Sequence, residues 1–326
     1  MSDAGHAKRV LIAGVANFWG APLATRLLAE PGVEAVIALD DRPPREGLDP
    51  RVVFVEGDLR SPGLAPLVRA AAPDTIVHNA LLQFPGRDRS QRTIHDVNVV
   101  GTLQLLAACD SLATLKAVVV RGSASIYGSE PSAPQFFTEE QARRFPLRTR
   151  FQRDVGEIES YVDTFARRHA GVTCTILRQQ PIIGTRIDTP ITRFLRLPVI
   201  PTVMGFDPRM QFIHEDDSVA VLAAAVRNPV AGAVNVANPG TISLARTLRR
   251  LRRPSLPIPH PLFARGARAV GRAGGVNFSE DMLRYMRWGR GVDLRRLTDE
   301  IGFTPERTTE QVIEAVARGH GHKEDG

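Results

Sequence analysis

The stretch that most constrains the fold of this chain runs from Lys8 to Gly20 and reads KRVLIAGVANFWG. Residues 10–14 form a short apolar run that predicts a buried strand, and the following APLATRLLAE predicts a helix. A strand, a tight glycine loop and a helix near the start of a long chain are typical of a dinucleotide-binding sheet. The spacing is Gly14-x-x-Asn17-x-x-Gly20, without the middle glycine, so the loop alone does not establish nucleotide binding. Asn17 tolerates left-handed backbone better than most residues, and we expect it to preserve the loop.

Apolar segments alternate with helical segments through the first half of the chain. Continuous apolar strands between helices indicate a parallel sheet that is covered on both faces. Right-handed crossovers then give a doubly wound, Rossmann-type sheet with ligands at the carboxyl ends of its strands. The expected strands cover residues 10–14, 35–40, 51–56, 74–78, 117–121 and 172–177, and the expected helices cover about 62–72, 89–109 and 152–169.

This alternation breaks after Arg178, where prolines separate short segments. A helix after 211–217 and a strand at 233–237 indicate that the chain returns once to the sheet. The sequence therefore predicts an α/β fold with a Rossmann domain over residues 1–178, completed by return segments near 211–237. A smaller C-terminal α/β lobe follows over 179–318, and a disordered tail covers 319–326.

The composition excludes several classes of protein. No apolar run reaches the ~18 residues that a membrane span needs, and the start MSDAGHAKR lacks the apolar core of a signal peptide, so we expect a cytoplasmic protein with no membrane span. The net charge of +7 permits a phosphate-bearing ligand or an acidic partner but does not indicate nucleic acid. Cys109 and Cys174 fall in a helical and a strand pattern, and we expect buried thiols rather than a disulfide or a metal pair.

Asp40 closes the second expected strand, twenty residues after the glycine loop. A carboxylate at this position accepts both hydroxyls of the adenosine ribose and repels a 2′-phosphate, which favours NAD over NADP. The alternative is an acid that only caps a turn or helix, and the nearby Arg42 leaves room for a phosphate.

Two further strand ends carry candidate cofactor contacts. Asp58 and Leu59 follow the third strand, where Asp58 could bond the adenine amino group. Asn79 and Ala80 follow the fourth strand, where small residues allow the backbone to approach the cofactor. The predicted cofactor-binding residues are Gly14, Asn17, Phe18, Trp19, Gly20, Asp40, Arg42, Asp58, Leu59, Asn79 and Ala80.

These motifs occur in a familiar order. The chain carries AGVANFWG, the acid Asp40, EGDLR, IVHNA, NVVGTLQLLAAC, RGSASIYGS and FIHEDDSVAVLAAA. Over about residues 8–240 it resembles the extended short-chain dehydrogenases/reductases of the NAD-dependent epimerase/dehydratase family, most of all the UDP-glucose 4-epimerases. The resemblance implies bound NAD, a nucleotide-sugar substrate and, through the helices near 89–109 and 152–169, a homodimer.

The resemblance also implies a tyrosine and a lysine four residues apart on one helix. The tyrosine would move a proton to or from the substrate oxygen, while the lysine would hold the nicotinamide ribose and lower the tyrosine pKa from ~10. A serine that fixes the same oxygen is matched by Ser123. Phe151 stands at the tyrosine position and Val155 at the lysine position.

No alignment can restore this pair. The chain's tyrosines are Tyr127, Tyr161 and Tyr285, and the residues four positions beyond them are Pro131, Phe165 and Gly289. General acid–base help is typically worth ~10²–10⁴ in rate, so its loss would cripple the usual hydride transfer. Groups that could replace it, on or near the expected helix or the serine loop, are Tyr127, Arg150, Arg153, Asp154 and Glu157.

Two functional hypotheses stay open at this stage. One is an enzyme that oxidises a nucleotide sugar transiently with Ser123 and a non-standard acid/base. The other is a catalytically inactive NAD(H)-binding sensor or scaffold protein.

The expected substrate side also departs from the family pattern. Pro181 stands where nucleotide-sugar enzymes usually carry an asparagine, and Met210 fills an arginine position, with Arg209 displaced by one residue. The basic segment 244–253 is either a source of phosphate contacts or a solvated helix face. His214 and the three acids after it predict a helix cap rather than a metal site.

Overall fold

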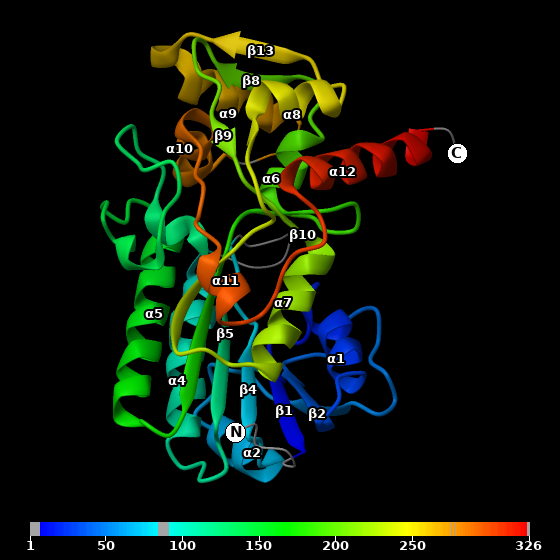
Figure 1. The fold of residues 1–326 in the computed structure, drawn as a ribbon, viewed down its shortest axis with the longest axis vertical. Helices are drawn as coiled ribbons and strands as arrows, with labels where there is room; N and C mark the ends of the chain where they lie inside the picture. Colours follow the sequence, from blue (N-terminus) through cyan, green and yellow to red (C-terminus); the bar gives the residue numbers. More distant parts are fainter. Residues whose placement is uncertain (1–6, 84–90, 275, 277, 325–326) are drawn as a thin grey trace.

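A computed structural model describes residues 7–83, 91–274, 276 and 278–324, and a parallel seven-stranded sheet lies at its centre (Figure 1). The strand order is β11-β6-β5-β4-β1-β2-β3, so the chain moves outward from β1, returns to β4 and moves outward on the other side. Every neighbouring pair is parallel, which confirms the predicted doubly wound sheet. The strands are β1 Lys8–Ala13, β2 Val33–Asp40, β3 Val53–Glu56, β4 Thr75–His78, β5 Ala117–Ser123, β6 Thr173–Gln179 and β11 Gly232–Val236.

The side chains of β1 alternate between two cores, and this explains why both faces of the sheet are covered. Val10 and Ile12 pack in one buried cluster with Leu23, whereas Leu11 packs in the opposite cluster with Ile158. Figure 1 shows α1 and α7 on one side of the sheet and α4 and α5 on the other. The covering helices are α1 Gly20–Leu28, α2 Leu64–Ala71, α4 Gly101–Cys109, α5 Arg150–Arg168 and α7 Glu215–Arg227.

A smaller lobe caps the carboxyl edge of the sheet and has a third buried cluster of its own. Strands β8 and β13 pair in parallel there, beside helices α8, α9 and α10. The elements of this lobe are α6 Pro190–Leu195, β8 Ile200–Val203, β9 Arg209–Met210, β12 Ile242–Ser243, α8 Leu244–Arg250, β13 Ser255–Ile258, α9 Phe263–Ala273, α10 Glu280–Trp288 and α12 Thr309–Glu324. The remaining elements are α3 Gln91–His95, the short π-helix η1 Asp96–Val100, the 3-10 turns η2 Ala124–Tyr127, η3 Glu139–Gln141 and η4 His260–Leu262, β7 Ile182–Ile183, β10 Ile213–His214 and α11 Arg295–Asp299.

Three local features refine the sequence-based expectations. The helix expected over about 89–109 is divided into α3, η1 and α4, and residues 84–90 lie outside the described part of the chain. Helix α12 continues to Glu324, into the segment predicted to be disordered, because adding a residue to a helix anchored by Val312 and Val316 is easier than nucleating one. Its last two positions, 325–326, are not described. Cys109 and Cys174 are buried and free, as expected.

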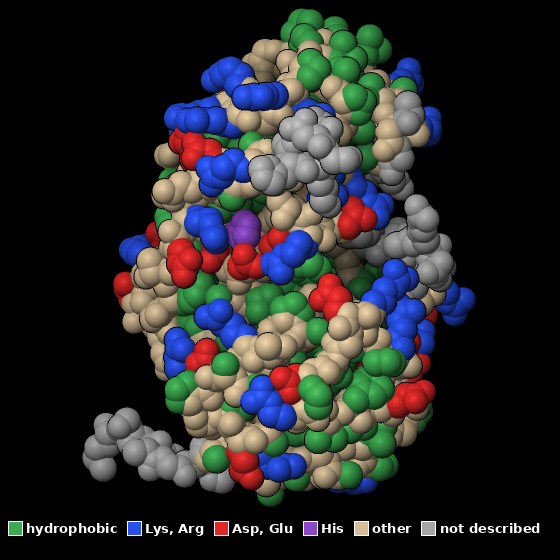
Figure 2. Space-filling view, turned by 90° about the vertical axis from the view of Figure 1, so that its right-hand side faces the viewer, with side chains coloured by type: hydrophobic (Ala, Val, Ile, Leu, Met, Phe, Trp, Pro, Cys, Tyr) green, Lys and Arg blue, Asp and Glu red, His purple; other side chains and the backbone are tan. Residues whose placement is uncertain are grey.

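Charged side chains are spread over the face shown in Figure 2, where Lys and Arg lie among Asp and Glu. Hydrophobic side chains gather at the upper tip of this face, and exposed apolar residues of the C-terminal lobe include Met204, Leu256 and Leu262. Within the described residues, none of the helices combines the length and apolar character that crossing a lipid bilayer requires.

Candidate cofactor and ligand site

The loop between β1 and α1 requires both of its terminal glycines. Gly14 has a φ of +87°, and a Cβ there would lie 2.7 Å from the Cα of Ala80. A Cβ on Gly20 would lie 1.8 Å from the carbonyl oxygen of Val15. Glycine at these two positions therefore lets the ends of β1, β4 and α1 meet closely.

Asn17 supports this loop through its side chain rather than its backbone. It is not among the described residues with positive φ, so the left-handed conformation expected from the sequence is wrong. Its Nδ2 donates to the carbonyl oxygens of Gly14 at 2.8 Å and Asn79 at 2.6 Å, and its Oδ1 accepts from the Trp19 amide at 3.0 Å. The side-chain amide replaces the missing glycine by tying the loop to the end of β4.

The N-terminus of α1 is suited to an anion. Trp19 is the N-cap and provides no side-chain cap. Among the hydrogen bonds of the described residues, none uses the backbone N–H of Phe18 or Ala21. Free amides at a helix N-terminus fit the pyrophosphate of a dinucleotide, so the residues present are compatible with NAD.

Asp40 lies at the end of β2, against the same loop. Its Oδ2 accepts from the Ala16 amide at 2.8 Å and its Oδ1 from the Asp41 amide at 2.8 Å. Burial raises the pKa of Asp40 to about 6, helped by the neighbouring Asp41. Arg42 instead lies 4.0 Å from Asp41 on the exposed side.

Asp58, the predicted adenine contact, is already engaged within the protein. The carboxylate of Asp58 accepts from the guanidinium of Arg60, with Nη2 at 2.6 Å from Oδ2. Leu59 and Ala80 are buried in the apolar cluster on the α5 side of the sheet. The contact between Asp58 and adenine stays a prediction.

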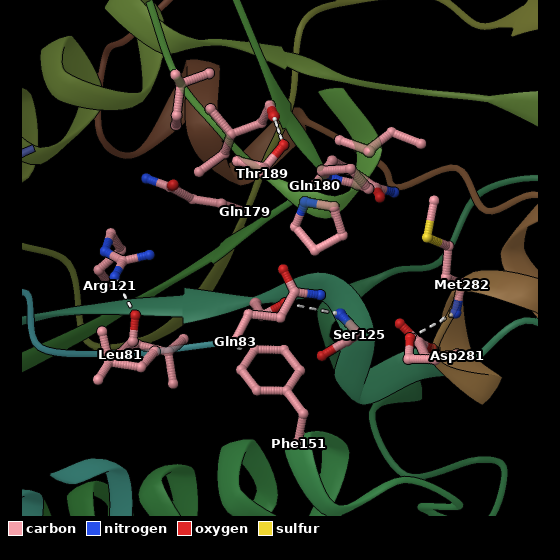
Figure 3. Close-up of a pocket in the computed structure, with 18 of the residues that line it drawn as sticks. Leu81, Gln83, Arg121, Ser125, Phe151, Gln179, Gln180, Thr189, Asp281 and Met282 are labelled. Atoms are coloured by element: carbon pink, nitrogen blue, oxygen red, sulfur yellow. Dashed lines mark hydrogen bonds between the residues drawn. The ribbon is translucent and has the colours of Figure 1, made fainter. Parts of the chain in front are cut away.

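A cavity of about 390 Å³ opens where the glycine loop, the carboxyl ends of β5 and β6 and the C-terminal lobe meet. Phe18 and Trp19 line it from the loop, and Ser123 lines it from β5. Phe151 and Asp281 face it from α5 and α10, as Figure 3 shows. This is the edge of a doubly wound sheet at which ligands bind.

Phe151 and Val155, the two positions predicted to correspond to the tyrosine and lysine of the resembled family, have different surroundings. Phe151 points into the cavity, where its ring has no proton to give (Figure 3). Val155, one helical turn further, is 1% exposed and packs in the apolar cluster beneath α5. A lysine side chain at position 155 would therefore leave the backbone inside this apolar cluster.

Tyr127 is not among the described residues that line the cavity, so the prediction that it could replace the missing acid/base is wrong. Its hydroxyl donates to Oδ1 of Asn235 at 2.6 Å and accepts from Nη1 of Arg178 at 2.9 Å. Burial raises its pKa to about 12. The 3-10 turn η2 directs this ring into the core, away from Ser123.

The candidates on α5 are also corrected. Asp154 is buried and accepts from Nδ1 of His95 at 2.8 Å, so it links α5 to α3. Arg150, Arg153 and Glu157 are exposed on α5 and are not among the residues that line the cavity.

Asp281 is the carboxylate that the sequence did not reveal. Its Oδ1 accepts from Nε2 of Gln152 at 2.9 Å, and the same nitrogen donates to the carbonyl oxygen of Ser125 at 3.1 Å. Nη1 of Arg290 lies 3.8 Å from Oδ1 of Asp281. Burial raises the pKa of Asp281 above its ordinary value. Asp281 lies far from the other site residues in sequence, in a lobe without a recognisable motif.

The remaining substrate-side predictions have mixed outcomes. Pro181 lines the cavity, whereas Met210 is fully buried in the C-terminal lobe and Arg209 is exposed. No arginine of α8 is among the described residues that line the cavity, and Arg246 and Arg250 pair with Glu310 of α12. His214 caps α7 by accepting from the Asp216 amide at 3.2 Å, which confirms the helix-cap interpretation.

The chain is similar in sequence to several curated proteins. An uncharacterized protein from Mycobacterium tuberculosis is 33% identical over 97% of this chain and 85% of its own length. The UDP-glucose 4-epimerase of Mycolicibacterium smegmatis is 31% identical over 39% of this chain and 42% of its own.

Solved structures share the fold. The UDP-glucose 4-epimerase of Thermotoga maritima, solved with UDP-glucose, superposes with a TM-score of 0.72 at 16% identity, covering 96% of this chain and 99% of its own. The dTDP-glucose 4,6-dehydratase of Bacillus anthracis, solved with NAD, gives a TM-score of 0.70 at 14% identity, covering 97% of each chain. The sequence profile of the NAD dependent epimerase/dehydratase family matches residues 10–238. The chain therefore belongs to the NAD-dependent epimerase/dehydratase family.

Proposed function

We propose that this protein binds NAD and a nucleotide sugar in the cavity described above and oxidises a sugar hydroxyl transiently, with Asp281 as the proton-transfer group. The observation that carries the proposal is the convergence of the glycine loop, Ser123, Phe151 and Asp281 on one cavity. Family membership supports NAD as the cofactor.

The cofactor half of the proposal rests on the loop. The free amides of Phe18 and Ala21 would hold the pyrophosphate, and Asp40 would accept from the adenosine ribose. When bound, NAD supplies a hydride acceptor. The protein's task is then to hold the sugar and to take and return the hydroxyl proton.

Asp281 is the carboxylate best placed for that task. Phe151 cannot accept a proton. Among the described residues that line the cavity, the other acid is Asp188, whose two oxygens accept from Arg193 at 2.8 and 2.7 Å. Asp281 instead has a neutral partner, Gln152, and a cation at 3.8 Å. Burial raises the pKa of the Asp281 carboxyl in the direction of neutral pH, which favours reversible proton transfer. Ser123 would bond the same sugar oxygen.

The nucleotide-sugar substrate is proposed from relatives. The Thermotoga maritima structure contains UDP-glucose, and the substrate class agrees with a cavity that opens between the sheet and the C-terminal lobe. The family pattern also supports a homodimer through α4 and α5. Val100 and Leu103, 37% and 48% exposed beside α5, are apolar surface that such a contact would cover.

A second candidate function is supported by Phe151 and Val155 themselves. Neither an aromatic ring in the cavity at position 151 nor an apolar core residue at position 155 can transfer a proton, so a protein that holds NAD(H) through the glycine loop need not use it for hydride chemistry. The protein would then be a non-catalytic sensor or scaffold that responds to the NAD/NADH ratio.

The experiment that tests the proposal compares wild type, Asp281→Asn and the matched control Asp188→Asn. Each is incubated with NAD and a panel of nucleotide sugars, followed by product analysis and nicotinamide fluorescence. We expect Asp281→Asn to reduce turnover by about 100-fold or more while NAD affinity stays unchanged. Asp188→Asn should retain turnover.

Three other results would redirect the proposal. Tight NAD binding by wild type without turnover on any sugar favours the sensor. Turnover that survives in Asp281→Asn removes Asp281 from the mechanism. If calorimetry detects no NAD binding by wild type, both candidate functions are refuted.

A further inference from the structure

Arg121 is a buried cation at the edge of the cavity. It lies near the end of β5, two residues before Ser123, and is 5% exposed. Its guanidinium stacks on Trp19, with Cζ 4.1 Å from the ring centroid. Figure 3 shows the guanidinium beside Leu81 at the cavity wall.

Neutral acceptors bind only part of this guanidinium. Nε donates to Oδ1 of Asn79 at 2.8 Å, and Nη2 donates to the carbonyl oxygens of Asn79 at 3.1 Å and of Leu81. Among the described residues, no protein acceptor binds Nη1 and no carboxylate pairs with Arg121. Burial lowers the pKa of Arg121 to about 9, the cost expected of a cation without a counter-ion.

The other charged groups of the cavity have partners. Arg290 lies 3.8 Å from Asp281, and Arg186 pairs with Glu215 at 3.2 Å. Within the described cavity wall, Arg121 is therefore the cation whose charge the protein does not balance.

We propose that Arg121 is an oxyanion-binding residue whose free Nη1 takes a phosphate or carboxylate oxygen of the molecule held in the cavity. The inference rests on the proposed use of this cavity as a ligand site. The oxygen has two possible sources: the pyrophosphate of the dinucleotide, since Arg121 stacks on the N-cap of α1, or an anionic group of the second ligand. Arg121 would then supply from β5 a cation that Val155 cannot supply from α5.

A purely structural role predicts different behaviour. Arg121 could simply join β5 to the end of β4 through Asn79 and Leu81. In that case its loss would lower stability without a selective effect on anionic ligands.

The test measures ligand binding by calorimetry for wild type, Arg121→Gln, Arg121→Lys and the control Arg265→Gln, which removes the same charge from an exposed position on α9. The ligands are NAD, ADP-ribose, UDP-glucose, UDP-glucuronate, inorganic pyrophosphate, and the uncharged adenosine and uridine. We expect Arg121→Gln to lower the affinity for at least one anionic ligand by about tenfold or more, and the affinity for the nucleosides by less than about twofold. Arg121→Lys should retain part of the affinity, and Arg265→Gln all of it.

The pattern among ligands identifies the source of the oxygen. Losses for NAD and ADP-ribose assign it to the dinucleotide, whereas losses for the UDP compounds assign it to the second ligand. Equal affinity of wild type and Arg121→Gln for every anion overturns the inference and leaves the proposed function standing. If wild type binds no nucleotide, the proposed function fails, and the inference about Arg121 is then tested by the thermal shift that inorganic pyrophosphate produces. A rise in the melting temperature of wild type with pyrophosphate that is smaller in Arg121→Lys supports the anion site. No rise in wild type overturns it.

If Arg121→Gln does not fold, a crystal structure of wild type with the tightest ligand replaces it. An anionic oxygen within about 3.2 Å of Nη1 supports the inference, and a ligand whose anionic oxygens all lie elsewhere overturns it.

Discussion

The carboxyl of Asp40 makes NAD binding depend on pH in a way that can be measured directly. Burial raises its pKa to about 6, so the group changes charge within an accessible range. The ribose hydroxyls donate their hydrogen bonds to the ionised carboxylate, and a protonated carboxyl would bring its own hydrogen to the same place. NAD should therefore bind the ionised form, and affinity should fall as the pH falls through about 6.

The magnitude follows from the titration. If only the ionised form binds, the dissociation constant near pH 5 is about 11 times that near pH 8 for a pKa of about 6. The stability of the ligand-free protein should change in the opposite sense. Because the folded-state pKa is raised, the contribution of this carboxyl to stability is present below about pH 4 and is lost as the pH rises through 6. Its size is on the order of 3 kcal/mol.

The assay is calorimetric titration of NAD between about pH 5 and pH 8 with wild type, Asp40→Asn and Asp41→Asn. Asn keeps the acceptor for the Ala16 amide but does not titrate, so Asp40→Asn should bind more weakly and with flat pH dependence. Asp41→Asn should move the wild-type midpoint to lower pH, because Asp41 helps to raise the pKa of Asp40. Constant wild-type affinity over this range, or an equal decline in Asp40→Asn, would refute the reasoning.

Two further predictions concern stability. Val155→Lys should lower the free energy of unfolding in urea by about 3 kcal/mol or more, because it buries an ammonium in an apolar cluster. Phe151→Tyr, whose side chain faces the cavity, should lower it by less than about 1 kcal/mol. Equal stability of the two variants would contradict the placement of these side chains. Gly14→Ala and Gly32→Ala both place alanine at a position of positive φ, but only the former brings a Cβ against Ala80. Urea denaturation should therefore show Gly14→Ala to be less stable than Gly32→Ala by about 1–2 kcal/mol or more, and calorimetry should show weaker NAD binding only in Gly14→Ala. Equal losses would exclude the close approach of β1 and β4.

The sheet could be predicted because its signals are local. The inner strands β1, β4 and β5 are buried on both faces, so a short apolar run identifies them, and the alternation with helices fixes parallel pairing. Strand ends were less well defined: β6 extends to Gln179, two residues beyond the apolar run, where its polar side chain lines the cavity.

The site was less predictable because side-chain direction depends on tertiary contacts. Tyr127 lies four residues after Ser123, and proximity in sequence favoured a place in the cavity. The turn η2 sends it to Asn235 instead, a residue of β11 that no local pattern connects to it. Asn17 shows the same limit, since its tolerance of left-handed backbone suggested one role and a side-chain bond to Asn79 gives it another.

Arg121 and Asp281 together suggest why a cavity without tyrosine or lysine would keep charged walls. Burying the Arg121 guanidinium without a counter-ion, or the Asp281 carboxyl with its counter-ion 3.8 Å away, costs free energy, and apolar side chains of similar size would fill the same wall without this cost. The chain carries apolar residues at Phe151 and Val155 but charged residues at positions 121 and 281. A ligand that carries both an anionic group and a hydroxyl would satisfy both, the oxyanion on Arg121 and the hydroxyl on Asp281. Nucleotide sugars and dinucleotides have this pairing of groups, whereas a neutral apolar ligand would leave the Arg121 guanidinium without a counter-ion, so we expect the cavity to select ligands by charge as well as by shape.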